Sequence, residues 1–169
     1  IRFLEKPSIA EIEKLNLNTI NAGIYILEPS VLDLIPNGEK YSFEYQLFPS
    51  LLANESPFFA FAADKNYWLD IGTPQRYLQA NLDLLDGKII SSVEFDNNSI
   101  VGENSLIKEG AIVKRSIIGD NVTIEAGVLI ENSVIWSNAK IGANTRIINS
   151  VIGHDLEVAE NVLIDDNYL

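Results

Sequence analysis

The stretches Ser116–Asn132, SIIGDNVTIEAGVLIEN, and Ser133–Asn149, SVIWSNAKIGANTRIIN, decide the fold because they repeat one pattern after 17 residues. Branched aliphatic residues recur over residues 101–164 in steps of six, six and five. They are Val101, Ile107, Val113, Ile118, Ile124, Ile130, Ile135, Ile141, Ile147, Ile152, Val158 and Ile164. The 17-residue period, which is the sum of the three steps, holds for four turns of the pattern.

Residue types that tolerate a positive φ angle follow the same count, three positions after the start of each six-residue step. They are Asn104, Gly110, Asn121, Gly127, Asn138, Asn144, Asp155 and Asn161. A serine recurs in the five-residue steps, at Ser116, Ser133 and Ser150. One inward aliphatic residue and one tight corner per step predict a three-sided solenoid, whose short strands pair one period apart. The alternative, a sandwich of short strands, would not keep a 17-residue count.

Upstream of the repeat, residues 67–74, YWLDIGTP, lead an apolar segment with one carboxylate, Asp70, into a Gly-Thr-Pro turn. We expect Thr73 to be the N-cap of a helix and Pro74 its first residue, where the missing N–H of proline costs nothing. Gly87 is expected to end this helix.

Residues 1–71 are predicted to contain strands and short helices, with the last two strands joined by a hairpin turn over residues 63–66. The expected strands cover residues 1–4, 19–27, 58–62 and 67–71, and the expected helices cover residues 8–14, 29–35 and 43–53, the last divided or kinked at Pro49. These segments form no recognisable β-α-β unit, so the strands need neighbours from elsewhere to cover their edges. Because the chain also starts at Ile1 and contains no methionine, we expect it to be a fragment.

Composition excludes several classes of function. The 169 residues carry a net charge of −12, which disfavours nonspecific binding to polyphosphate or anionic lipid, although a small phosphorylated ligand remains possible. The chain has no cysteine, so disulfides, thiolate zinc sites and cysteine nucleophiles are excluded. No apolar run approaches the roughly 20 residues of a membrane span, and a cytoplasmic location is the default expectation.

Five motifs in order resemble the C-terminal part of sugar-phosphate nucleotidyltransferases, most closely the mannose-1-phosphate guanylyltransferase type. They are FLEKP at residues 3–7, NAGIY at 21–25, FE at 43–44 with FP at 48–49, WLDIGTP at 68–74, and NSVIW at 132–136 within the repeat. The repeat itself resembles the hexapeptide-repeat, left-handed parallel β-helix. Its handedness comes from the resemblance, since generic crossover rules favour right-handed connections.

The resemblance implies an α/β fragment followed by a solenoid. Residues 1–87 would be the C-terminal part of a Rossmann-like nucleotidyltransferase domain, and residues 88–169 a left-handed β-helix of about four 17-residue coils. The N-terminal nucleotide-binding half of the family is not in the sequence, so the fragment is expected to be inactive alone.

The family's reaction joins a nucleoside triphosphate to a sugar 1-phosphate and releases pyrophosphate. GDP-mannose from mannose 1-phosphate and GTP is the favoured product. Thymidylyl, uridylyl or adenylyl transfer to glucose 1-phosphate is the alternative. A non-catalytic assembly or regulatory module is the alternative from another class. The expected partners are these small substrates and further copies of the chain, bound through the β-helix, with no nucleic acid polymer and no membrane.

The resemblance also implies roles for individual residues. Asp70 would be one of two carboxylates that hold Mg²⁺, a hard cation that prefers oxygen ligands. Lys6 would bind the sugar phosphate and, with Asp70, form the catalytic pair. Glu5 would accept hydrogen bonds from sugar hydroxyls, and the main chain from Asn21 to Gly23 would line the sugar pocket.

Each assignment has a structural alternative. Asp70 could cap the following helix, Glu5 and Lys6 could be a solvated pair, Gly23 could relieve crowding in a core strand, and Asn21 could be a turn residue. His154, the only histidine, follows Gly153 at a predicted corner and is expected to be exposed rather than catalytic. Trp136 is expected to point outward, toward another subunit or toward the helix over residues 74–86.

Overall fold

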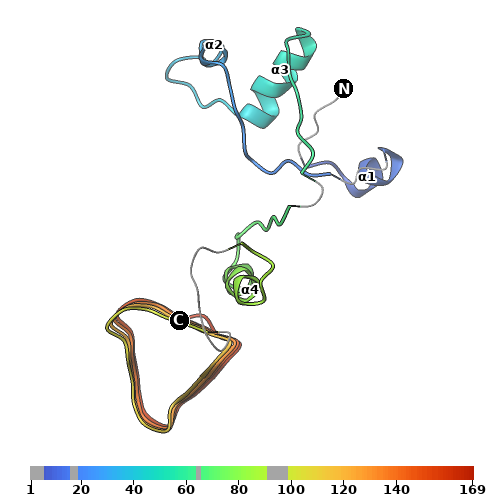
Figure 1. Cartoon of the computed structure of the whole chain (residues 1–169). Coiled ribbons are helices and arrows are strands. Elements are labelled where there is room, and N and C mark those ends of the chain that lie inside the picture. The colour runs from blue at the N-terminus through green and yellow to red at the C-terminus, as the bar shows by residue number, and fades with distance from the viewer. Residues whose placement is uncertain (1–5, 16–18, 64–65, 91–98) are drawn as a thin grey trace. The chain divides into compact units, whose positions relative to one another are not determined.

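The computed structural model describes residues 6–15, 19–63, 66–90 and 99–169 (Figure 1). The chain divides into two compact units, Ile1–Asn66 and Tyr67–Leu169. Each unit is described by itself below.

The second unit contains a three-sided solenoid built from three parallel four-stranded sheets. The first sheet contains β1 (Ile100–Val101), β4 (Ile117–Ile118), β7 (Val134–Ile135) and β10 (Val151–Ile152). The second contains β2 (Leu106–Ile107), β5 (Thr123–Ile124), β8 (Lys140–Ile141) and β11 (Glu157–Val158). The third contains β3 (Ile112–Lys114), β6 (Leu129–Glu131), β9 (Arg146–Ile148) and β12 (Leu163–Asp165).

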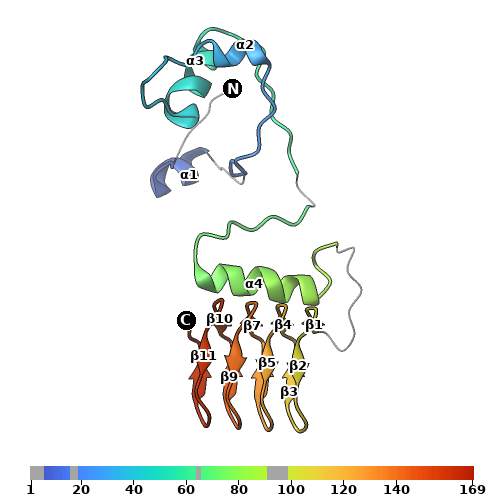
Figure 2. The same ribbon diagram turned by 90° about the vertical axis from the view of Figure 1, so that its left-hand side faces the viewer.

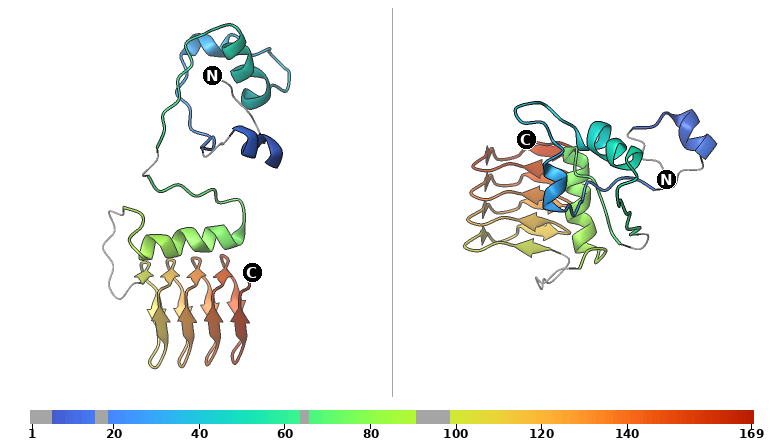
Figure 3. Two further views of the ribbon diagram at one scale, coloured as in Figure 1. Left: turned by 90° about the vertical axis from the view of Figure 1, so that its right-hand side faces the viewer. Right: turned by 90° about the horizontal axis from the view of Figure 1, so that it is seen from above.

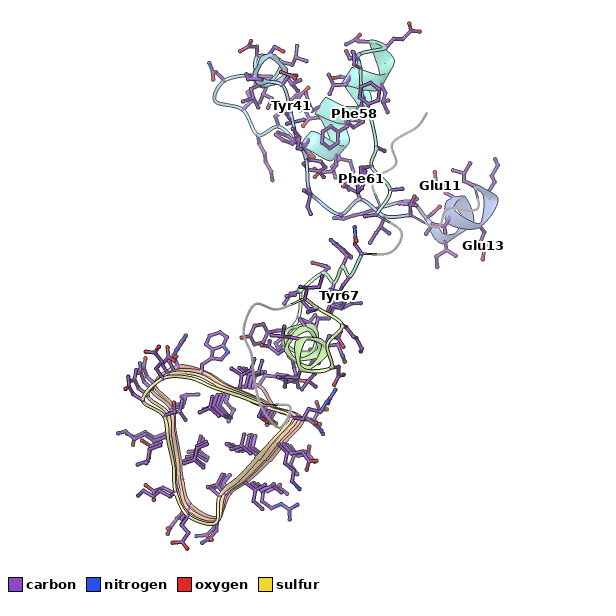
Figure 4. The ribbon with its side chains drawn as sticks, viewed as in Figure 1. Glu11, Glu13, Tyr41, Phe58, Phe61 and Tyr67 are labelled. Carbon is purple, nitrogen blue, oxygen red and sulfur yellow. The ribbon has the colours of Figure 1, made fainter. Side chains whose placement is uncertain are left out.

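The register of every sheet confirms the predicted period, because each residue pairs with the residue 17 positions away, as Ile118 does with Ile135. Viewed along its axis the solenoid is a triangle, with columns of side chains filling its interior (Figures 1 and 4). The inward aliphatic residues of the central coils are fully buried, as shown by Ile124, Ile130 and Ile141. Stacked coils therefore bury the continuous apolar core that a single coil could not.

The corners also follow the prediction. All eight predicted corner residues have positive φ angles, among them Asn104 at 56°, Gly127 at 71° and Asn138 at 64°. A third column of corners was not predicted and consists of Arg115, Asn132, Asn149 and Asp166. Its signal was the asparagine that precedes Ser133 and Ser150.

The recurring serines form a buried ladder between coils. Ser133 Oγ donates to the Glu131 carbonyl at 2.7 Å and accepts the main-chain N–H of Ser150 at 3.1 Å. The Ser116 hydroxyl makes the equivalent pair of contacts, with the Lys114 carbonyl and the N–H of Ser133. Each serine therefore satisfies polar main-chain groups at a corner that is closed to water.

Helix α4 (Pro74–Leu85) packs on the outer face of the first sheet, running across its strands (Figure 2). Thr73 Oγ1 accepts the N–H of Arg76 at 3.2 Å, which confirms the predicted N-cap. Gly87 follows the helix with a φ angle of 73°. Leu78, Leu82 and Leu85 contact an apolar stripe on the sheet, which consists of Ile100, Ile117, Val134 and Val151. Seen from above, the coils form successive layers beside this helix (Figure 3).

The first unit has short helices and a small aromatic core, to which α1 contributes no residue. They are α1 (Ile9–Leu15), α2 (Pro29–Leu32), the π-helical turn η1 (Phe43–Leu47) and α3 (Phe48–Ala53). The junction of η1 and α3 confirms the division expected near Pro49, which lies in the first turn of α3. Leu47 and Phe48 are fully buried, and Tyr25 and Phe58 pack against them.

The prediction of strands before α4 is wrong for the residues that the structure describes. Residues 19–27, 58–62 and 67–71 are not strands, and the described part of residues 6–73 contains none. A β-strand forms only when a neighbouring strand accepts and donates its main-chain hydrogen bonds. No described segment pairs with residues 19–27, 58–62 or 67–71 in this way, so their apolar content alone does not make them strands. The strand predicted over residues 1–4 lies outside the described residues. No helix within the described ranges is long and apolar enough to cross a membrane.

Candidate functional site

The predicted sugar-binding stretch forms a compact turn. Asn21 Oδ1 accepts the main-chain N–H of Gly23 at 3.1 Å, and Gly23 has a φ angle of 72°. A Cβ added at Gly23 would meet no atom within 4 Å. Glycine is therefore needed here for its left-handed backbone and not to relieve crowding. The turn also agrees with the alternative that Asn21 is a turn residue, which is compatible with ligand binding by the exposed main chain.

A chain of polar groups fixes this turn to the helical part of the unit. Asn21 Nδ2 donates to the Tyr25 hydroxyl at 2.6 Å, and that hydroxyl donates to Glu44 Oε1 at 3.2 Å. The Ser42 hydroxyl donates to the other oxygen of Glu44 at 3.1 Å. Sequence reasoning quoted Glu44 in a motif but gave it no role. The available signal was that Glu44 lies in one of the family motifs, FE at residues 43–44, which follows the NAGIY motif at residues 21–25 in the chain.

Glu44 stays ionised in this arrangement. A hydrogen bond from its own main-chain N–H, with those from the Ser42 and Tyr25 hydroxyls, holds the pKa of Glu44 below its usual value. The charge of Lys6 acts in the same direction. Lys6 itself is exposed and has a φ angle of 47°, whereas Glu5 lies outside the described residues. The first unit thus links the Asn21–Gly23 turn to Glu44 through Tyr25, and the positive charge of Lys6 acts on the Glu44 carboxylate.

Asp70 belongs to the second unit, in the segment that leads into α4. It is exposed, and no described residue donates a hydrogen bond to its carboxylate. The cap of α4 is supplied by Thr73, so Asp70 does not cap this helix. The segment is anchored by the Tyr67 hydroxyl, which donates to the buried Asp83 at 2.9 Å. Tyr67 is labelled beside α4 in Figure 4.

The donor set for a metal is therefore a single carboxylate. Carboxylate oxygen suits Mg²⁺, which also accepts water and substrate phosphates as ligands. Among the described residues, no group of three or more histidine, aspartate or glutamate side chains could hold a metal ion. Asp70 can supply one ligand of such a site but does not form a cage.

Trp136 and His154 lie together beside α4. The indole Nε1–H of Trp136 donates to the Tyr77 hydroxyl at 3.1 Å, so the tryptophan packs on the helix, one of its two expected contacts. His154 is exposed, and the centroid of its ring lies 4.7 Å from the ring centroid of Trp136.

Comparison with known proteins identifies both halves of the chain. Residues 1–87 match the family model described as Nucleotidyl transferase, which covers just over half of the sequence. The chain belongs to the nucleotidyl transferase family. Residues 77–169 match the model described as EIF2B subunit epsilon LbH domain, in agreement with the left-handed β-helix expected of this nucleotidyl transferase. Most of α4 lies within both matches.

Several named proteins are similar to this nucleotidyl transferase chain. It is 40% identical over 89 residues to a UTP–glucose-1-phosphate uridylyltransferase of Synechocystis, covering 53% of this chain and 22% of that protein. It is 38% identical over 87 residues to the mannose-1-phosphate guanylyltransferase of Mycobacterium tuberculosis, covering 52% and 23%. A probable mannose-1-phosphate guanylyltransferase 1 of Oryza sativa is 37% identical over 119 residues, covering 66% and 31%. The matches thus span between a fifth and a third of the relatives' length.

Proposed function

We propose that this chain is part of a sugar-1-phosphate nucleotidyltransferase that makes a nucleotide sugar and releases pyrophosphate. The observation that carries the proposal is the match of residues 1–87 to the nucleotidyl transferase model. Mannose 1-phosphate and GTP are the favoured substrates, because several of the similar proteins are named mannose-1-phosphate guanylyltransferases. The similar uridylyltransferase supports glucose 1-phosphate and UTP as the alternative pair.

The first unit would bind and orient the sugar phosphate. The exposed Asn21–Gly23 turn offers main-chain groups to sugar hydroxyls, and the Tyr25–Glu44 hydrogen bond keeps that turn in one conformation. Lys6 would neutralise the sugar phosphate as a point charge, and Glu5 would accept hydrogen bonds from the sugar. Such positioning is the main source of catalysis in transfer between phosphates, because no covalent nucleophile is required.

Asp70 would hold Mg²⁺ together with groups beyond the described residues. A bound Mg²⁺ would supply positive charge to the reacting phosphates. The support from this chain is the chemistry of the donor, an exposed carboxylate that no described residue engages. The carboxylate is thereby available to a cation.

The substrate assignment is tested by measuring pyrophosphate release with Mg²⁺ and a panel of nucleoside triphosphates and sugar 1-phosphates. The full-length polypeptide that contains this chain should turn over one pair, with GTP and mannose 1-phosphate preferred. The 169-residue chain assayed in parallel should give no product, because the relatives it matches are much longer. Turnover by the short chain would contradict the proposal that it is incomplete, and no turnover of any pair by the full-length polypeptide would contradict the activity.

We also propose that the solenoid joins copies of the chain. The support is a pair of exposed apolar side chains on the outer face of the third sheet, Ile112 and Leu163, at opposite ends of that sheet. Light scattering should find a dimer or larger species that Ile112→Asp with Leu163→Asp converts to monomer. A wild-type chain that stays monomeric at high concentration would contradict this proposal.

A further inference from the structure

A groove runs between α4 and the first sheet of the solenoid, and all of its lining residues belong to the second unit. Its volume is about 320 Å³, and its lining includes Tyr77, Asn81, Ile117, Gly119, Trp136 and His154. This volume lies at the lower end of the range for small-molecule sites, and the groove is shallow and open to solvent, so a bound ligand would stay partly exposed. We call it the Trp136 groove. None of its lining residues takes part in the proposed sugar transfer, so the inference is independent of the proposed function.

The groove exists because one coil departs from the repeat. The positions equivalent to Trp136 in the other coils are Gly102, Gly119 and Gly153. A Cβ at Gly119 would lie 2.7 Å from the main-chain nitrogen of Ser137, so this position accepts no side chain without a shift. Trp136 is the exception in this column, and its indole stands beside the bare main chain of the preceding coil.

The indole is held in place while remaining open to solvent. Its N–H donates to the Tyr77 hydroxyl, and the Tyr77 ring meets it edge-on with 5.8 Å between centroids and 75° between planes. His154 contacts it from the following coil with an interplanar angle of 57°. Trp136 is nevertheless 36% exposed. An aromatic surface that is fixed before binding loses little conformational entropy when a flat ring stacks on it.

The helix side of the groove offers a hydrogen-bond donor and an acceptor. The Asn81 amide nitrogen donates to the Tyr77 carbonyl at 2.8 Å, which fixes the amide and leaves its Oδ1 without a donor among the described residues. The Tyr77 hydroxyl accepts from Trp136, and its own proton has no acceptor among them. A planar ligand that carries both an amino group and a ring acceptor would satisfy both groups.

The charge of the site disfavours an anionic ligand. No lysine or arginine lines the groove, and the whole chain carries a net charge of −12. Phosphate groups would therefore gain nothing here. Base stacking on an aromatic side chain needs only a π face and is worth about 1–3 kcal/mol per base.

We propose that the Trp136 groove binds the base of a purine nucleoside. The base stacks on the exposed indole above Gly119, its amino group donates to Asn81 Oδ1, and a ring nitrogen accepts from the Tyr77 hydroxyl. A purine presents this combination of a broad π face, donors and acceptors, and its ribose would extend toward solvent.

The test is fluorescence titration of the whole chain with guanosine and adenosine. The only tryptophans are Trp68 and Trp136, so Trp68→Phe leaves Trp136 as the sole reporter. We expect saturable quenching with a Kd of about 1 mM or tighter. Asn81→Leu should weaken binding at least about fivefold, whereas Gln75→Leu, an exposed change on the same helix, should leave Kd unchanged.

Two outcomes would overturn the proposal. One is quenching that is linear and equal to that of free tryptophan, which would show collision without binding. The other is equal affinity for guanosine and uridine, which would remove the purine assignment. The chemical shift of the Trp136 indole N–H provides a second readout that does not depend on fluorescence, and it should move with the same Kd. Unfolding curves of each variant establish that the fold is kept.

Discussion

Substitutions at Asn138 would measure how much the left-handed corners contribute to the solenoid. Asn138 has a φ angle of 64°, and its Nδ2 donates to Asp155 Oδ1 in the next coil at 2.9 Å. Asn138 Oδ1 also accepts from Asn121 Nδ2 at 3.4 Å, so Asn138→Gly removes two hydrogen bonds, at a cost of about 0.5–1.5 kcal/mol each. Asn138→Ala removes the same two bonds and also forces alanine into a conformation that costs about 1–2 kcal/mol.

The expected order of stability is therefore opposite to that at ordinary positions. Glycine loses about 0.5–1 kcal/mol more than alanine through backbone entropy, so the net advantage of Asn138→Gly over Asn138→Ala centres on about 0.75 kcal/mol, the difference between the midpoints of the two ranges. Urea unfolding followed by circular dichroism measures the difference, provided that the slopes of the two transitions agree.

Glu160 supplies the matched control. It is exposed, its φ angle is not among the positive ones, and the equivalent residues of two other coils are Ala126 and Ala143. Here Glu160→Ala should be more stable than Glu160→Gly. The reasoning is refuted if alanine equals or exceeds glycine at Asn138 while the control keeps its order.

Three further predictions concern buried contacts. Ser133→Ala should destabilise the solenoid by about 1–3 kcal/mol in urea unfolding, because it leaves the N–H of Ser150 without its acceptor; an unchanged midpoint would contradict the ladder. Leu82→Ala should cost about 2–5 kcal/mol by opening a cavity under α4, and a cost near zero would show that the helix is not packed on the sheet. Hydrogen bonds from Lys88, Tyr67 and Gln79 hold the pKa of Asp83 below its usual value. The ionised Asp83 carboxylate therefore stabilises the folded state above a pH of about 3.9, the ordinary pKa of aspartate in an unfolded chain. This stabilisation is lost as the pH falls through the lower pKa of the folded state. Thermal unfolding should show this loss in the wild type and a weaker pH dependence in Asp83→Asn, and equal pH profiles would contradict it.

The solenoid was predictable because its physics is local and periodic. An inward aliphatic residue and a left-handed corner are each required once per side, so the sequence from Val101 to Ile164 carries the same signal repeatedly. The apolar stripe on which α4 packs was equally readable, but only a contact between this helix and Trp136 was expected from the sequence. The outward position of the first sheet is apolar in every coil, where it is occupied by Ile100, Ile117, Val134 and Val151. The equivalent outward position of the second sheet, in contrast, includes Lys140 and Glu157.

The region before α4 was less predictable because strands depend on partners. Residues 19–27 have the apolar content of a buried strand, yet Ile24 and Ile26 are exposed and no described segment pairs with them. The Asn21–Gly23 turn depends on contacts within three residues, yet it was expected only as an alternative for Asn21, because residues 19–27 were predicted to be a strand and the sugar-binding role came from the family resemblance. The Glu44 contact spans 19 residues and needed the fold to be seen.

The most direct test of the account is the turnover of Asp70→Asn in the full-length polypeptide with GTP, mannose 1-phosphate and Mg²⁺. Loss of a ligand that helps to neutralise the reacting phosphates should lower kcat by about 100-fold or more. Asp33→Asn, a change of another exposed aspartate in the first unit, should leave kcat unaltered. If Asp70→Asn keeps the turnover and the Mg²⁺ dependence of the wild type, Asp70 is not a ligand, and the proposed site is wrong at its central residue.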